Sequence, residues 1–173
     1  MIRQVALLRG INVGGKNIVP MAALREVFTS LGHREVTTVL QSGNVVFSAP
    51  EPAVPGDLEA AISERLAVTC RVVVVTGDEL GAVVAHNPFA GQAATTVHVG
   101  FVGAPLDPRS LGAIDVASFA PEELVPGDRH LYLHLPGGMG RARMPSHLER
   151  RLGVPITYRN WATVTRLAGQ ACG

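Results

Sequence analysis

The sequence predicts an α+β protein built from two halves that share one order of elements, βαββαβ. Three observations predict this class. Short apolar runs typical of strands alternate with amphipathic stretches of helical spacing, and the order occurs twice along the 173 residues. Runs such as residues 72–75 (VVVV) are apolar at every position, which is typical of a sheet covered on both faces. The order βαββαβ is that of the ferredoxin-like fold, in which both helices lie on one face of an antiparallel sheet.

The first half has the clearer pattern. Residues 5–9 (VALLR) predict a buried strand. A helix is expected at residues 20–32, because Pro20 suits a helix start, apolar residues follow at helical spacing and Gly32 suits the end. The next expected elements are strands at 36–41 and 44–48 that form a hairpin, a helix at 57–68 and a strand at 71–76.

The second half repeats the order less clearly, after a connecting helix at residues 77–86. Its expected elements are a strand at 95–102, a helical turn at 107–114, a weak strand at 115–120, a strong strand at 130–136, a helix at 146–153, a strand at 155–159 and a final helix at 161–170. Because strands of the first half are apolar on both faces, the two halves are expected to pack into one compact body with extra helices. We place these halves at 1–78 and 79–173, within one domain over 1–173.

Composition and charge exclude several classes of protein. A hydrophobic share of 47% with 17% charged residues indicates a folded chain. The formal net charge of +1 leaves no broad basic field for nucleic acid or membranes. No apolar run is long enough to cross a membrane, and the N-terminal residues do not resemble a secretory signal. Cys70 and Cys172 have neither disulfide nor metal spacing. We therefore expect a cytoplasmic protein without a membrane partner.

A glycine-rich segment at residues 8–17 (LRGINVGGKN) is the first candidate site. It is one substitution short of a phosphate-binding P-loop, but Asn17 lacks the hydroxyl that holds magnesium, and Pro20 would fall inside the P-loop helix. Two interpretations remain. Either the glycines only permit a turn, or their N–H groups and nearby side chains hold a phosphate or carboxylate. The candidate residues are Arg9, Asn12, Gly14, Gly15 and Lys16, the only lysine of the chain.

Three other segments place polar residues at the ends of expected elements. They contribute Gln41, Ser42 and Asn44 at the hairpin turn, Arg143 in the glycine-rich stretch at 137–144, and Arg159, Asn160 and Trp161 before the final helix. Each has a purely structural alternative. Turn chemistry alone explains the hairpin residues, and an N-cap with a buried aromatic anchor explains Asn160 and Trp161.

No catalytic or metal-binding pattern is recognisable. His130, Tyr132 and His134 share one face of a strand, but no carboxylate or cysteine stands at a telling spacing, so no metal site is expected. The sequence has no nucleophile elbow, cysteine signature or diagnostic carboxylate pair. We expect no cofactor, and the residues leave open whether the protein is an enzyme.

Three strings of residues carry a family resemblance. They are ALLRGINVGGKNIVPMAALREVF at 6–28, VTTVLQSGNVVF at 36–47 and RLGVPITYRNWATVTRL at 151–167. Together they resemble the bacterial family known as domain of unknown function 1697. The resemblance spans nearly the whole chain, implies an α+β fold of ferredoxin-like halves and brings no established enzymatic activity. The family pattern falls on Arg9, Gly10, Asn12, Gly14, Gly15, Lys16, Gln41, Ser42, Gly43, Asn44, Arg159, Asn160 and Trp161. Where the family often has Ser and Lys, this chain has Ala142 and Arg143.

The leading functional expectation is a small anionic or polar ligand, bound between the loop at 8–17, the hairpin turn at 41–44 and the segment 159–161. One alternative is a nucleic-acid-binding module, which 5% aromatic residues and the near-neutral charge make unlikely. The other is a protein-interaction or dimerisation module, suggested by the apolar composition and by edge strands.

Overall fold

The computed structural model describes residues 1–172, which form two compact units. Unit 1 comprises Met1–Val84 together with the stretch that begins at Arg166, and unit 2 comprises Ala85–Thr165. The chain therefore leaves unit 1, forms unit 2 and returns to unit 1, whereas the expected halves are each continuous in sequence. The described residues form an α+β protein with two four-stranded antiparallel sheets and six α-helices.

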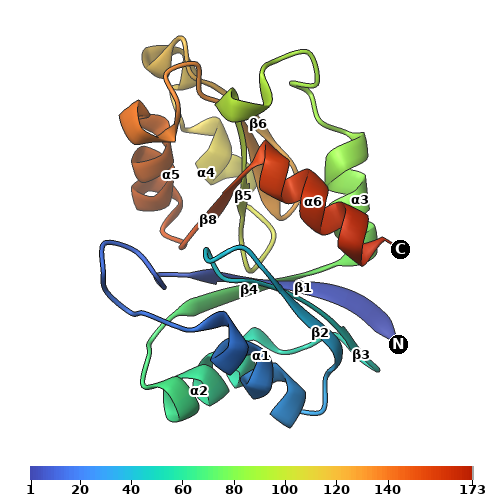
Figure 1. The fold of residues 1–173 in the computed structure, drawn as a ribbon. Helices are drawn as coiled ribbons and strands as arrows, with labels where there is room; N and C mark the ends of the chain where they lie inside the picture. The colour runs from blue at the N-terminus through green and yellow to red at the C-terminus, as the bar shows by residue number, and fades with distance from the viewer. Residues whose placement is uncertain (173) are drawn as a thin grey trace. The chain divides into compact units, whose positions relative to one another are not determined.

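Unit 1 has the element order βαββαβ. Its elements are β1 (Ile2–Arg9), α1 (Met21–Ser30), β2 (Arg34–Val39), β3 (Asn44–Ala49), α2 (Pro55–Leu66) and β4 (Arg71–Thr76), and α3 (Gly77–Ala85) follows them. The strand order in the sheet is β2-β3-β1-β4, and all neighbouring strands are antiparallel. Both α1 and α2 cover the same face of this sheet (Figure 1).

The core of unit 1 lies between that face and the two helices. Leu24 and Phe28 lie one turn apart on α1, and Leu58 and Ile62 lie one turn apart on α2. All four side chains are buried, and the Phe28 ring packs edge-on against Phe47 of β3. Burial of each such side chain stabilises the fold by roughly 1.5–3 kcal/mol, so this apolar stripe fixes the helices on the sheet.

Unit 2 contains a second sheet, with strand order β6-β7-β5-β8. Its elements are β5 (Val97–Phe101), α4 (Pro108–Gly112), β6 (Glu123–Pro126), β7 (His130–His134), α5 (Met144–Leu152) and β8 (Thr157–Asn160), with short 3-10 helices at Ala94–Thr96, Val116–Phe119 and Met139–Arg141. Leu131 and Leu133 of β7 pack against Met144 and Leu148 of α5 in the core of this unit. Helix α6 (Trp161–Ala171) begins in unit 2 and ends in unit 1.

The prediction of a strand at residues 115–120 is wrong. Val116–Phe119 is a 3-10 helix, and the strand that pairs with β7 is β6, a few residues later. Ser118 explains the difference, because its hydroxyl and its N–H both donate to the carbonyl oxygen of Asp115, at 2.7 and 3.2 Å. Such local hydrogen bonds compete with extended structure and close a turn instead.

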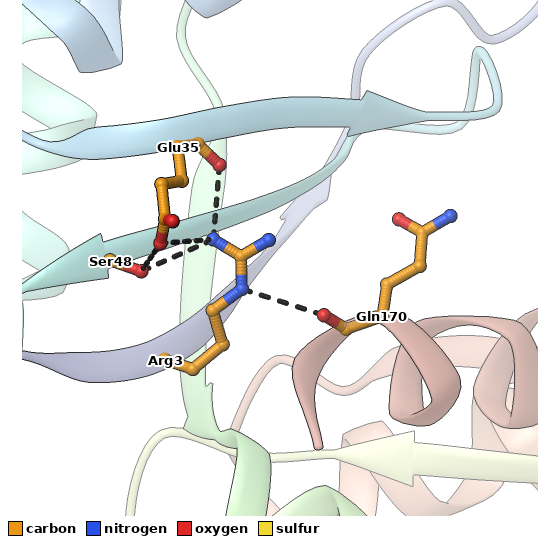
Figure 2. Close-up of polar contacts among 4 residues, drawn as sticks. All are labelled: Arg3, Glu35, Ser48 and Gln170. Carbon is orange, nitrogen blue, oxygen red and sulfur yellow. Dashed lines mark hydrogen bonds and ion pairs between the residues drawn. The ribbon is translucent and has the colours of Figure 1, made fainter. Parts of the chain in front are cut away.

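Arg3 of β1 connects the β2 edge of unit 1 to the last turn of α6 (Figure 2). Its Nη1 donates to the carbonyl oxygen of Glu35 (3.0 Å) and to Ser48 Oγ (3.2 Å), and its Nε donates to the carbonyl oxygen of Gln170 (3.5 Å). The Ser48 hydroxyl donates to Glu35 Oε2 (2.7 Å). Glu35 has φ of +51° at a register shift between β2 and β3. Arg3 therefore stabilises an irregular place in the sheet and satisfies a carbonyl at a helix end.

Among the helices of residues 1–172, none combines the length and the apolar composition that a membrane crossing requires.

Candidate functional site

Residues 12–17 form a small hairpin-like loop after β1. Val13 and Lys16 make an isolated antiparallel bridge, in which Lys16 N donates to the carbonyl oxygen of Val13 (3.0 Å). Between them, Gly14 and Gly15 have φ of +59° and +72°, and a type I′ turn requires two successive left-handed residues. The turn therefore accounts for both glycines, and the side chain of Lys16 lies exposed beside them.

Asn12 fastens this loop to the rest of unit 1. Its Oδ1 accepts a hydrogen bond from Val19 N (2.7 Å), and its Nδ2 donates to the carbonyl oxygens of Val19 (3.1 Å) and Gln41 (2.9 Å). Asn17 adds a bond from Nδ2 to the carbonyl oxygen of Gly10 (2.8 Å). The Asn12 side chain, expected to face a ligand, thus engages its oxygen and its amide nitrogen within the fold.

The turn between β2 and β3 packs against the same loop. Gly43 has φ of +84°, and its carbonyl oxygen accepts from Leu8 N (2.8 Å). Asn44 is fully buried, and its Nδ2 donates to the carbonyl oxygen of Val39 (2.8 Å) and to Ser42 Oγ (2.9 Å). Two of the predicted segments, the loop at 8–17 and the turn at 41–44, therefore lie together in unit 1.

A cavity of about 600 Å³ opens where β1 ends. The residues that line it include Arg9, Gly10, Glu59, Ser63, Thr69, Cys70 and Arg71, from the end of β1, from α2 and from the start of β4. This volume is within the usual range of small-molecule sites, roughly 300–1,000 Å³. Arg9 and Arg71 are direct partners in the antiparallel register of β1 and β4, so two cationic side chains stand side by side at the cavity.

The charged groups of this cavity are two guanidinium groups and one carboxylate. Glu59 Oε2 lies 3.5 Å from Arg71 Nη1, and Glu59 Oε1 accepts from Val72 N (2.8 Å). Burial, and then the charge of Glu59, raise the pKa of the Cys70 thiol to about 11. The thiol is therefore protonated and a weak nucleophile near neutral pH. Among residues 1–172, no group of three or more His, Cys, Asp or Glu side chains is placed to hold a metal ion.

A family model described as protein of unknown function (DUF1697) matches residues 1–132. The chain belongs to this family. The match confirms the family resemblance and covers two of the three sequence strings, those at 6–28 and 36–47. A similar solved structure is that of the conserved bacterial protein SP0830 from Streptococcus pneumoniae, with a TM-score of 0.74 and 24% sequence identity over 98% of each chain. At this identity the likeness shows the fold alone. No curated protein matched the chain.

In this member of the DUF1697 family, Arg143 has structural partners in unit 2. Its Nη2 donates to the carbonyl oxygen of Ser118 (3.2 Å), and its guanidinium lies 5.4 Å from the centre of the Phe119 ring. The N-terminus of α5 is occupied as well, because Arg143 N and Met144 N donate to Glu122 Oε1 (2.9 Å) and Oε2 (2.8 Å). The helix N-terminus beside the candidate residue Arg143 therefore already holds a carboxylate of the chain itself.

The predicted site residues Arg159, Asn160 and Trp161 lie where β8 ends and α6 begins. Asn160 Oδ1 accepts from Thr163 N (2.9 Å), which confirms the predicted N-cap. Burial lowers the pKa of Arg159 to about 10, so its guanidinium still carries charge at neutral pH, and its Nη1 donates to the carbonyl oxygen of Tyr158 (2.9 Å). Trp161 is half-buried at the first turn of the helix.

Within single units, the structure brings together part of the predicted set. Arg9, Asn12, Gly14, Gly15, Lys16, Gln41, Ser42 and Asn44 lie in unit 1, and Arg143, Arg159, Asn160 and Trp161 lie in unit 2. Their convergence into one site stays a prediction. Sequence reasoning missed Glu59, Ser63, Thr69 and Arg71, which join Arg9 only through the packing of α2 and the pairing of β4 with β1. One sequence feature could have indicated this site: Arg71 is a charged residue directly before a run of four valines.

Proposed function

We propose that unit 1 binds a small molecule carrying a phosphate or carboxylate group in the cavity lined by Arg9 and Arg71. The observation that carries the proposal is the pair of arginines at facing positions of β1 and β4, with a single carboxylate, Glu59, in the same lining. A guanidinium presents a planar fork of N–H donors that matches the oxygens of a phosphate or carboxylate.

Electrostatics favours an anion between the two arginines. Like charges at directly opposite cross-strand positions destabilise a sheet. Glu59 offsets part of this repulsion through its contact with Arg71. An oxyanion that touched both guanidinium groups would replace their mutual repulsion by two attractions.

The rest of the lining suits the other end of such a ligand. Ser63 and Thr69 provide hydroxyl groups that would donate hydrogen bonds to ligand oxygens. Gly10 leaves the loop backbone without a side chain at the cavity wall. Lys16 lies in the loop that follows, and we propose that it adds charge to a wider site, as the sequence predicts. Cys70 has no assigned chemical role, because its raised pKa keeps the thiol protonated.

We also infer that both units are ferredoxin-like. The support is that the order β6-β7-β5-β8 in unit 2 corresponds strand by strand to the order β2-β3-β1-β4 in unit 1. Both orders follow from the sequence βαββαβ with antiparallel neighbours. A cytoplasmic location is part of the same proposal, supported by the free thiols of Cys70 and Cys172.

Thermal shift measurements test the proposed site. A ligand that binds only the folded state raises the melting temperature, and at a concentration 100 times its Kd it adds about 2.7 kcal/mol of stability. The probes are inorganic phosphate, sugar phosphates, nucleoside monophosphates and dicarboxylates. We expect at least one to raise the melting temperature of the wild type, and we expect the rise to shrink in Arg9→Ala and in Arg71→Ala.

Arg25→Ala is the matched control, because Arg25 is an exposed arginine on α1 outside the cavity. This variant should respond like the wild type. Lys16→Ala reports whether the loop takes part in binding. Equal responses of the wild type and of Arg9→Ala to every probe would show that the cavity is not the binding site.

A further inference from the structure

A second cavity in unit 1 is lined by none of the predicted site residues. Its volume is about 360 Å³, and it lies between the C-terminal end of α1 and the connection from β3 to α2. Apolar side chains, among them Leu31, Val54 and Leu58, make up most of its lining. The polar side chains that line it are His33, Glu51 and Asp57.

Contacts with the core hold the walls of this cavity in place. Gln4 is fully buried on β1, its Nε2 donates to the carbonyl oxygen of Glu51 (2.9 Å), and its Oε1 accepts from Ala53 N (2.8 Å). The ring of His33 lies 4.7 Å from the Phe47 ring and 5.9 Å from the Phe28 ring, centre to centre. A preformed cavity needs little ordering when a ligand enters, which favours binding.

The charge of this lining is negative. No lysine or arginine lines the cavity, and within residues 1–172 neither Glu51 nor Asp57 has an ion-pair partner. Burial lowers the pKa of His33, so its ring is neutral near neutral pH and adds no compensating charge. Asp57 lies in the first turn of α2, where the helix dipole offsets part of its charge, so Glu51 carries the larger unbalanced charge.

Two large apolar side chains at this cavity are exposed to solvent. Leu31 is 41% exposed and Val54 is 58% exposed. A ligand with an apolar body would remove this surface from water, which is favourable in proportion to the area covered. The cavity therefore offers apolar contact and negative charge to the same ligand.

We propose that this cavity binds a small amphipathic cation, an amine with an apolar body, whose ammonium group faces Glu51 and Asp57 while the body covers Leu31 and Val54. This site is separate from the oxyanion site of the proposed function and has the opposite charge. Its three parts, the preformed apolar walls, the unpaired carboxylates and the exposed apolar rim, point to one class of ligand.

Three probes that share one apolar body and differ in charge test this inference: 2-phenylethylamine, 2-phenylethanol and 3-phenylpropanoate. Binding is measured by NMR titration of the whole protein, following the His33 ring and the methyl groups of Leu31 and Val54. We expect the amine to bind at least about tenfold more tightly than the alcohol, since charge-assisted contacts are the stronger ones. The propanoate should bind more weakly than the alcohol.

Charge-removing variants assign that preference to the two carboxylates. Glu51→Gln should reduce the preference for the amine more than Asp57→Asn, and the double variant should remove it. Glu64→Gln, which changes an exposed glutamate of α2 outside this cavity, should keep the preference of the wild type. Equal affinity for the amine and the alcohol, resonance shifts confined to other parts of the protein, or an unchanged preference in the double variant would each overturn the inference.

Discussion

At the scale of single residues, Gly43 shows how closely the turn between β2 and β3 packs against the end of β1 and the loop that follows it. A Cβ atom at this position would lie 2.7 Å from Ile11 Cδ1 and 2.9 Å from Leu8 Cβ. The φ of +84° would add backbone strain for any other residue. Gly43→Ala is therefore expected to lower the free energy of unfolding by roughly 2–4 kcal/mol, measured by urea denaturation.

Gly10→Ala separates the two causes. Gly10 has nearly the same φ, +86°, but a Cβ there would meet no atom within 4 Å. We expect backbone strain alone to lower the free energy of unfolding of this variant, by about 1–2 kcal/mol. Equal losses in the two variants would mean that the contact between the turn and the loop contributes nothing.

His33 gives unit 1 a pH dependence of known sign. Burial lowers its pKa in the folded state, so the unfolded chain binds the proton more readily. The free energy of unfolding should therefore fall as the pH decreases from about 7 to about 5.

His33→Phe removes this titration and keeps a ring beside Phe28 and Phe47, so the stability of this variant should fall less over that range. His98, whose pKa burial also lowers, would account for dependence that remains. An identical fall in wild type and variant, followed by urea denaturation at each pH, would contradict this assignment.

Single residues also show which parts of the site sequence reasoning can reach. The N-cap role of Asn160 was predictable because it involves a backbone N–H three residues away. Asn12 was expected to face a ligand, yet its partners are backbone groups of Val19 and Gln41, and the second lies far along the chain. Arg71 became a site residue only through the pairing of β4 with β1, which no local pattern encodes.

At the scale of elements, the N-terminus of α5 is capped by a carboxylate from a preceding segment, that of Glu122. Glu122 accepts from two N–H groups at the start of this helix, and none of the described residues of the helix first turn is acidic. Glu122→Gln removes the charge and weakens both hydrogen bonds, so we expect a loss of about 1–2 kcal/mol in urea denaturation. Glu64→Gln, an exposed change on α2, should alter the midpoint little. Equal midpoints for both variants would show that Glu122 does not stabilise α5.

Elements were predictable where their signals are local. The helix expected at 20–32 is α1, Met21–Ser30, because Pro20 and Gly32 bound an apolar stripe of helical spacing. The strand β6 was not predictable, because its residues, ELVP, carry little strand signal and depend on pairing with β7. The cavity between β1, α2 and β4 was not predictable either, because its lining comes from three separate parts of the sequence that meet only in the fold.

At the scale of the whole molecule, unit 1 depends on residues that follow unit 2 in the sequence. Gln170 accepts a hydrogen bond from Arg3, and Cys172 Sγ donates to the carbonyl oxygen of Gly77 (3.0 Å). A chain ending at Thr165 loses both contacts. We expect its amide hydrogens to exchange faster in β1 and β4, with a smaller change in β7, when measured by hydrogen exchange and mass spectrometry. Unchanged exchange in β1 would show that unit 1 does not need this segment.

The interrupted course of unit 1 also sets the order in which the protein can mature on the ribosome. Translation delivers β1 to β4 first, but the segment that begins at Arg166 follows only after Ala85–Thr165 has been made. At roughly 5–20 residues per second, this delay lasts about 4–16 seconds. During that time the nascent chain has all four strands of its sheet but lacks the helical segment that contacts Arg3 and Gly77. Stalled chains that end near residue 84 should therefore recruit chaperones more strongly than chains extended beyond Ala171.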